Sequence, residues 1–288
     1  MPSVNTPTSL DQSWWMKVKR ARQHLAAIVE QVDQLGDGSP RPIRVAEHHQ
    51  TDSWIYTAHL DLTIDPMLPV ILGEFLYDLR SALDHIAAAN VPAHRSSKSQ
   101  FPIFTDDIWQ PVPDGSAFDE LRSRRSKQRK DWSGWTQGMP EAVLDIIQLA
   151  QPHEDDSTPA GNPDNHALTI LHVYQNADKH RELNIINPGI EDPHAIVTWP
   201  TGDRQEFTYH DIPAGKMLRD GGKFFQSHIP VKVDLSGTVR IAMARDPQLA
   251  HRELPGSLHA LIEEVGCVLA SIQDAMNTAD PTNAAPAH

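Results

Sequence analysis

Residues 66–90 read PMLPVILGEFLYDLRSALDHIAAAN, and this stretch decides the class of the fold. Its large apolar side chains recur every three or four residues, which is the spacing of one face of an α-helix. Asp65 and Pro66 form a favourable helix start, and Asn90 and Pro92 mark its end. The sequence therefore predicts a long amphipathic helix over 66–90, with a buried stripe made of Leu68, Leu72, Phe75, Leu76, Leu79, Leu83 and Ile86.

Further segments have the same helical spacing of apolar residues. They predict helices over 9–36, 139–150, 163–181 and 254–277. We expect the helices that begin near Pro66, Pro163 and Pro255 to pack together, because their apolar stripes have no other evident burial partner.

Two other regions place apolar residues at every second position, which is typical of β-strands. Residues 42–62 alternate around the polar letters HHQTDS and predict a β-hairpin. Residues 183–245 contain short strand-like runs separated by PTGD, PAG, DGG and DLSG turns, which predict an antiparallel β-meander. We therefore expect an α+β fold with a helical core of about five helices, in a single domain over 1–288 that ends in a flexible tail at 278–288.

Between residues 90 and 139 the many prolines and polar residues predict a long excursion over the surface, anchored by FPIF at 101–104. A basic run lies inside this segment and is followed by Trp132 and Trp135. Cations near aromatic rings can hold phosphates and stack bases. This pattern makes candidate nucleic-acid-binding residues of Arg124, Arg125, Arg129 and Lys130. The alternative is a solvated, mobile loop, as blocks of like charge usually are.

Composition restricts the function classes. The net charge of −13 disfavours nucleic-acid binding over the whole surface, although a local basic patch remains possible. A single cysteine, Cys267, excludes an intramolecular disulfide framework and predicts a cytoplasmic location. The first 25 residues lack the apolar core of a secretory signal, and no stretch is apolar enough to span a membrane.

Common cofactor and metal signatures are missing from the sequence. It contains no P-loop, no GxGxxG after a strand, no GxSxG and no HExxH. Asp84, His85 and His180 could in principle bind a divalent ion, but no spacing fixes their geometry. We therefore predict neither a metal nor a cofactor.

Four short segments carry a resemblance. They are LRSALDH at 79–85, FPIF at 101–104, LAQP at 149–152 and LHVYQNADKHREL at 171–183. Together they resemble a family of uncharacterised bacterial and phage proteins with L-R-x-x-L-D-H and N-x-D-K-H-R segments. This family has no assigned activity.

Arg80 and His85 also match the R-x4-H spacing of the HEPN superfamily, helical-bundle domains of which many are metal-independent ribonucleases that act as dimers. The resemblance implies RNA as the substrate and a homodimer, in which His85 moves a proton at the 2′-hydroxyl and Arg80 holds the phosphate. Ser81 stands where active members usually carry Asn, Asp or His, and the β region is foreign to a minimal helical bundle. Alternatively, Arg80 pairs with Asp84, its i+4 neighbour, in a purely structural contact.

The apolar stripe of the 163–181 helix continues onto Asp178, which aims a carboxylate inward. A buried carboxylate needs a cation, so we expect Asp178 to be buried and bonded to Arg80 or Arg181. It could orient the Arg80 and His85 pair in a site, or it could lock two helices in register. Supporting roles are predicted for Asp84, Asn176, Asp178, His180 and Arg181.

Two main functions remain open from the sequence, and a metal-dependent hydrolase is a third alternative. One is a HEPN-like, metal-independent ribonuclease in stress or phage defence, with Arg80 and His85 as catalytic residues. The other is a non-catalytic binding or scaffold protein in which the DH and DKHR segments are structural.

Overall fold

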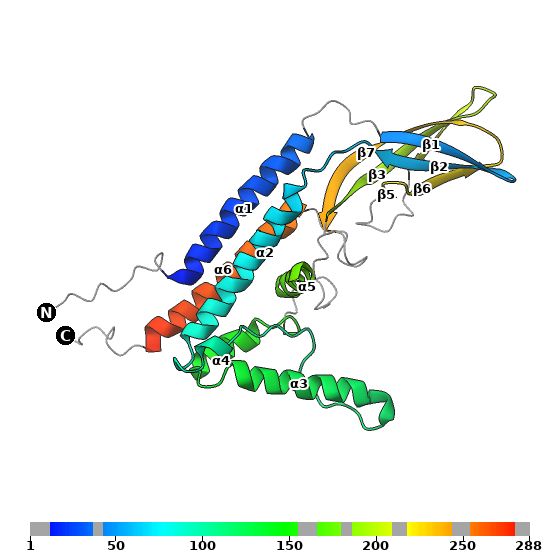
Figure 1. The fold of residues 1–288 in the computed structure, drawn as a ribbon. Coiled ribbons are helices and arrows are strands. Elements are labelled where there is room, and N and C mark those ends of the chain that lie inside the picture. The colour runs from blue at the N-terminus through cyan, green and yellow to red at the C-terminus, as the bar shows by residue number, and fades with distance from the viewer. Residues whose placement is uncertain are drawn as a thin grey trace. The chain divides into compact units, whose positions relative to one another are not determined.

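A computed structural model describes residues 12–36, 43–154, 166–179, 186–208, 218–243 and 254–279. Within these ranges the helices are α1 (Ser13–Gly36), α2 (Met67–Ala89), α3 (Asp119–Trp135), α4 (Glu141–Leu149), α5 (Ala167–Lys179) and α6 (Leu254–Ala279), with 3-10 turns η1 (Ser96–Lys98) and η2 (Ser116–Phe118). The strands are β1 (Ile43–Gln50), β2 (Ser53–Leu60), β3 (Ile186–Thr198), β4 (Arg204–Thr208), β5 (Leu218–Arg219), β6 (Lys223–Ser227) and β7 (Lys232–Met243). The predicted α+β class is confirmed (Figure 1).

The chain divides into two compact units. The first consists of Met1–Leu25, Leu72–Arg181 and Leu258–His288, and the second of Ala26–Ile71 and Glu182–Ser257. Because α1, α2 and α6 each have residues in both units, this division does not test the predicted single domain. Most of the predicted tail lies outside the described residues, and its first two positions belong to α6.

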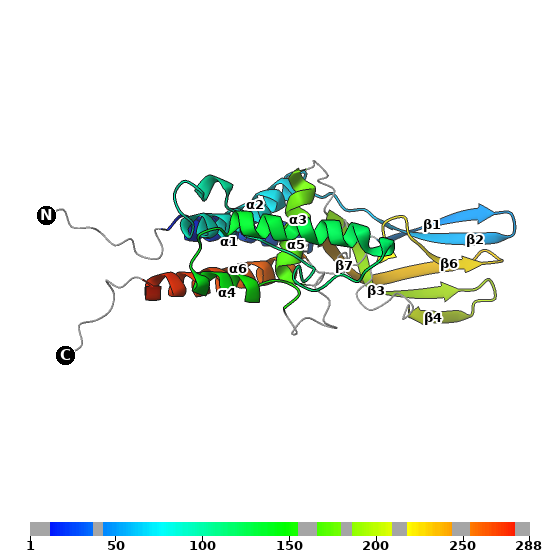
Figure 2. The ribbon, with the colours of Figure 1, turned by 90° about the horizontal axis from the view of Figure 1, so that it is seen from below.

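The first unit is built on helices whose apolar stripes are buried as predicted. Every residue of the stripe predicted for α2 has an exposed fraction of 0%. The Asn90 side-chain amide lies 3.3 Å from Met276 Sδ, and His166 Nε2 lies 3.9 Å from Glu264 Oε1, so α6 contacts both the end of α2 and the start of α5. These contacts confirm that the three helices pack in one unit; Figures 1 and 2 show α2 and α6 side by side.

The second unit contains two antiparallel sheets. One has the order β1-β2-β6, and its β1–β2 pair runs from Ile43 opposite Leu60 to Gln50 opposite Ser53, which confirms the predicted hairpin. The other has the order β4-β3-β5, with β7 also paired to β3. The region predicted as a meander is antiparallel as expected, and its strand β6 pairs with β2 of the hairpin.

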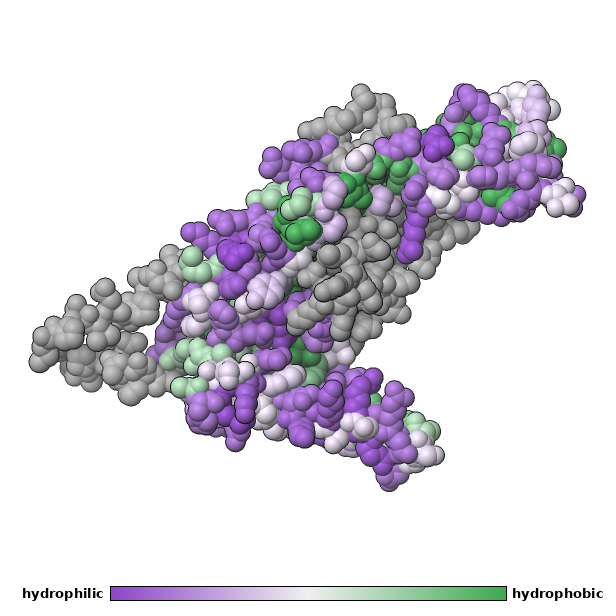
Figure 3. All heavy atoms as spheres, viewed as in Figure 1, coloured by the Kyte–Doolittle hydropathy of each residue, from purple (hydrophilic) through white to green (hydrophobic). Residues whose placement is uncertain are grey.

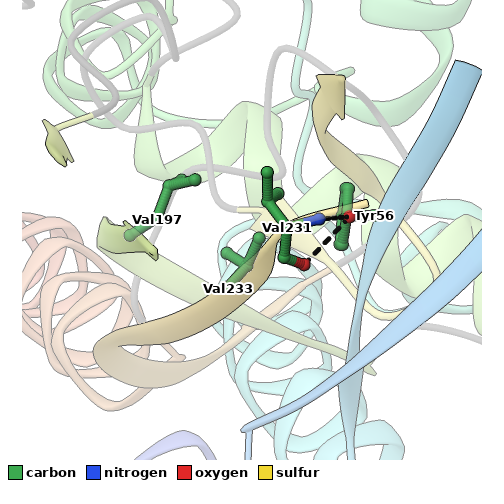
Figure 4. Packing of buried hydrophobic residues seen from close by; sticks show 5 residues of the cluster. Tyr56, Val197, Val231 and Val233 are labelled. Carbon is green, nitrogen blue, oxygen red and sulfur yellow. Dashed lines mark hydrogen bonds between the residues drawn. The ribbon is translucent and has the colours of Figure 1, made fainter. Parts of the chain in front are cut away.

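A small apolar cluster joins these sheets. Tyr56 of β2 packs with Ala195 and Val197 of β3, with Val233 of β7 and with Val231, which directly precedes β7 (Figure 4). The Tyr56 hydroxyl donates to Val231 O at 3.0 Å and accepts from Val231 N at 2.9 Å. Burial raises the pKa of the Tyr56 phenol above its ordinary value of 10.0, against the opposing effect of the Val231 N–H, and the nearby charge of Glu47 raises it further.

The structure contradicts one prediction, which concerns the segment that contains the basic run. The predicted surface excursion is wrong over residues 119–135, which form α3. Asp119 and Glu120 lie in its first turn, where negative charge favours a helix. The FPIF anchor is confirmed, since all four of its residues are buried.

No helix of the described part of the chain has both the length and the apolar character needed to cross a bilayer.

Candidate functional site

The guanidinium of Arg80 contacts both carboxylate oxygens of Asp84 in a two-point fork. Its Nη2 lies 3.0 Å from Asp84 Oδ1 and its Nε lies 3.3 Å from Oδ2, as the i+4 spacing on α2 predicts. The same Nη2 donates to the carbonyl oxygen of Phe101 at 2.7 Å. Because Arg80 is only 7% exposed, most of its guanidinium is withdrawn from solvent.

Asp84 completes the contact from the other side. Its Oδ1 accepts the backbone N–H of Phe101 at 2.9 Å, so both backbone polar groups of this buried residue are bonded to α2 side chains. Phe101 itself is fully buried, and an unpaired N–H or C=O there would destabilise the fold. Arg80 and Asp84 therefore satisfy the two backbone polar groups of Phe101, which lies outside any strand.

Gln151 clamps the other half of the FPIF segment. Its Oε1 accepts from Phe104 N at 2.9 Å, and its Nε2 donates to Pro102 O at 3.0 Å and to Ile147 O at 2.8 Å. Gln151 is 1% exposed. The structure thus brings together three of the four segments that carry the resemblance, LRSALDH, FPIF and LAQP. Sequence reasoning named LAQP but missed the role of its glutamine, whose partners lie about 50 positions away along the chain.

His85 lies apart from this network. Its side chain is half-buried, with Nδ1 at 3.0 Å from Ser13 Oγ and Nε2 at 3.4 Å from Ser81 Oγ. No contact between His85 and Arg80 is found among the described residues. At about 100° per residue, five positions turn the two side chains about 140° apart around α2.

The DKHR segment lies mostly outside the described residues. Its backbone is helical through Lys179, but the Asp178 side chain, His180 and Arg181 fall outside, so the predicted Asp178 pairing stays a prediction. Arg80 Nη1 is a buried nitrogen without a partner among the described residues. Asn176 Nδ2 lies 3.0 Å from His172 Nε2, one turn earlier on α5.

A buried carboxylate that the sequence analysis missed is Asp78, which is fully buried on α2. Lys17 Nζ lies 3.1 Å from its Oδ1, while Arg20 Nε and His24 Nε2 lie 3.3 Å and 3.5 Å from its Oδ2. These three cationic or basic side chains follow one face of α1. The available signal was position, because Asp78 lies three residues after the stripe residue Phe75.

The basic run is largely engaged by the segment before it. Arg124 pairs with Asp106 at 2.9 Å, the buried Arg125 donates to Gln110 O at 2.7 Å, and Arg129 donates to Ile108 O at 3.2 Å. Lys130 is exposed. These contacts hold residues 106–110 against α3 and give the basic run a structural role. The alternative of a solvated, mobile loop does not agree with them.

Metal ligands do not gather in the described part of the chain, where no three His, Cys, Asp or Glu side chains form a potential ion site. Asp84, one of the three residues that the sequence offered as metal ligands, is bonded to Arg80 and to the Phe101 N–H. Cys267 of α6 is a free, exposed cysteine. No family model, no curated protein and no solved structure matches this chain.

Proposed function

We propose that this chain is a non-catalytic binding or scaffold protein in which Arg80 and Asp84 are structural. The observation that carries the proposal is the bonding of Arg80, whose Nη2 serves both Asp84 and the Phe101 carbonyl in a buried position. A catalytic arginine has to reach a phosphate. This guanidinium would have to break its fork and release the FPIF segment before it could do so.

A structural role requires Arg80 to stay in its buried contacts, whereas a catalytic role requires it to leave them. Turning Arg80 outward would remove the hydrogen-bond donor to the buried Phe101 carbonyl and the cation beside the Asp84 carboxylate, which is unfavourable in a buried contact. The Arg80 and Asp84 fork therefore favours one fixed arrangement of α2 and FPIF. This supports a structural role for Arg80 and Asp84 rather than a catalytic one.

A second candidate is the HEPN-like ribonuclease, and the position of His85 favours it. The imidazole is half-buried and lies within reach of the hydroxyls of Ser13 and Ser81, and among the described residues it has no charged partner of the kind that holds Arg80. Imidazole is the side chain that most often serves as a general acid or base in catalysis. In that case a second protomer would have to supply the phosphate-binding cation.

One experiment separates the two functions. Purified protein is incubated with structured and single-stranded RNA in excess chelator, beside His85→Ala and Arg80→Lys variants and a control, His259→Ala, that removes an exposed histidine of α6. The binding or scaffold proposal expects no cleavage that depends on His85. A loss of about 10²–10⁴-fold in cleavage rate for His85→Ala, with the control unchanged, would overturn it in favour of the ribonuclease.

A further inference from the structure

A hydroxyl, an imidazole and a carboxylate meet in the second unit. Thr57 and His59 are two positions apart on β2, so both side chains project from the same face of the strand. His59 Nε2 lies 3.1 Å from Thr57 Oγ1, and His59 Nδ1 lies 3.6 Å from Asp220 Oδ1. The three groups stand in the order in which a base activates a nucleophile and a third group orients the base.

These contacts favour one form of the imidazole. A proton on Nδ1 faces the Asp220 carboxylate, which leaves Nε2 with a lone pair that accepts from the Thr57 hydroxyl. A second acceptor, the Ala46 carbonyl, is farther from that hydroxyl, at 3.5 Å. The contact between His59 and Asp220 is longer than a hydrogen bond and is electrostatic, as contacts of this kind often are before a substrate binds.

Asp220 is held beside the imidazole by a turn that contains two glycines. Its Oδ1 also accepts the Leu60 N–H at 2.9 Å. Gly221 N donates to Ala58 O at 2.7 Å, and Gly222 O accepts from Ala58 N at 3.0 Å. Gly221 has a φ of 72°, a backbone conformation that favours glycine. These bonds to β2 fix the position of the carboxylate, which is the preorganisation that a reactive group requires.

A cation lies next to Thr57 on the neighbouring strand. The register between β2 and β6 shifts at this point, so that Lys223 rather than Phe224 stands opposite Thr57 and on the same face of the sheet. Lys223 Nζ is bonded to the neutral Gln226 Oε1 and has no ion pair among the described residues. Thr57 is half-buried and the His59 side chain is 29% exposed, so a small molecule can reach both. Figure 3 shows hydrophilic residues over much of the region of β1 and β2.

We propose that Thr57 is an activated hydroxyl that takes an acyl group from an activated ester. His59 Nε2 accepts the hydroxyl proton as Thr57 Oγ1 bonds to the carbonyl carbon, and Lys223 stabilises the negative charge on the carbonyl oxygen. The bond from that carbon to the leaving oxygen then breaks, and the leaving group takes the proton from His59. The products are an ester on Thr57 and a free alcohol. This single transfer modifies the chain, and it goes beyond the binding or scaffold role without relying on the Arg80 network.

The probe is p-nitrophenyl acetate, incubated with the full chain. Absorbance follows the release of nitrophenolate, and mass spectrometry of tryptic peptides locates the acetyl group. Thr57 should become acetylated, and His59→Ala should slow this step by about 10²–10⁴-fold, the usual contribution of a general base. Thr57→Ser keeps a hydroxyl and should react. Asp220→Asn keeps an acceptor for the Leu60 N–H but removes the charge, so it should also slow the reaction while circular dichroism shows an intact fold.

A matched control is His48→Ala, which removes an exposed histidine from the same face of the β1–β2 pair and should react as the parent does. Acetylation of Lys19, an exposed amine of α1, is an internal reference and should be equal in every variant. An unmodified Thr57, or equal acetylation of Thr57 in His59→Ala, would overturn the proposal and leave these side chains the task of holding the turn on β2. Release of more nitrophenolate than there are protein chains, dependent on Thr57, would overturn the non-catalytic role and leave the activated hydroxyl standing.

Discussion

Replacement of Arg80 by alanine is expected to lower the free energy of unfolding by about 1.5–4 kcal/mol. The hydrogen bond from the guanidinium to the buried Phe101 carbonyl involves a charged group and contributes about 1.5–3 kcal/mol. The pair with Asp84 adds about 1 kcal/mol at most, because the Asp84 side chain is 32% exposed and water screens it. The sum of these two contributions sets the expected range.

Two further variants divide that effect. Arg80→Lys keeps the positive charge but cannot form the fork, so we expect it to recover only about half of the loss. Asp84→Asn keeps an acceptor for the Phe101 N–H and removes the charge, which should cost about 1 kcal/mol. Because Arg80 and Asp84 share one network, the double variant should be less destabilised than the sum of the single variants.

The assay is urea unfolding followed by circular dichroism and by tryptophan fluorescence. Trp132 and Trp135 lie against Phe104, so their emission reports on the region that contains the FPIF segment. Coincident transitions from the two signals would justify a two-state treatment. A matched control is Arg44→Ala, which breaks an exposed pair with Asp61 and should cost less than about 1 kcal/mol.

Two results would refute this reasoning. One is an Arg80→Ala variant whose stability lies within about 0.5 kcal/mol of the parent, the usual range for surface substitutions. The other is strict additivity of the Arg80 and Asp84 variants. Either would mean that the guanidinium is not needed to hold Phe101 and remains available for chemistry.

Two other changes probe the buried polar contacts. Asp78→Asn removes the charge that faces Lys17 and should cost about 1.5–3 kcal/mol in urea unfolding; a variant as stable as the parent would contradict a structural role for this carboxylate. Tyr56→Phe tests the pH dependence of stability. Because the pKa of the Tyr56 phenol is raised in the folded state, the unfolded chain loses this proton at a lower pH than the folded chain does. The contribution of Tyr56 to stability is therefore retained below pH 10 and falls as the pH rises above it. The parent should therefore lose stability above pH 10 more steeply than Tyr56→Phe, and equal slopes for the two proteins would argue against the raised pKa.

The sequence by itself determined the helices with strong apolar periodicity and the hairpin. The stripe over 66–90 was predicted residue by residue, and all seven members are buried. This succeeds because the 3.6-residue and two-residue periods are local properties of the chain. Helix α3 escaped the same reasoning, because its sequence is polar and has no wide apolar stripe.

The pairing of Arg80 with Asp84 was among the alternatives that the sequence left open, since the i+4 spacing on one helix is visible in the letters. Only the tertiary structure decided what this pair holds. Phe101 is 17 positions beyond Asp84 along the chain, and no local period relates the two. The same reason hid the bonds of Gln151 to FPIF, the cations around Asp78 and the pairing of β6 with β2. Polar contacts across long chain separations depend on where packing brings the backbone, and hydrophobic patterning does not specify which polar groups then meet.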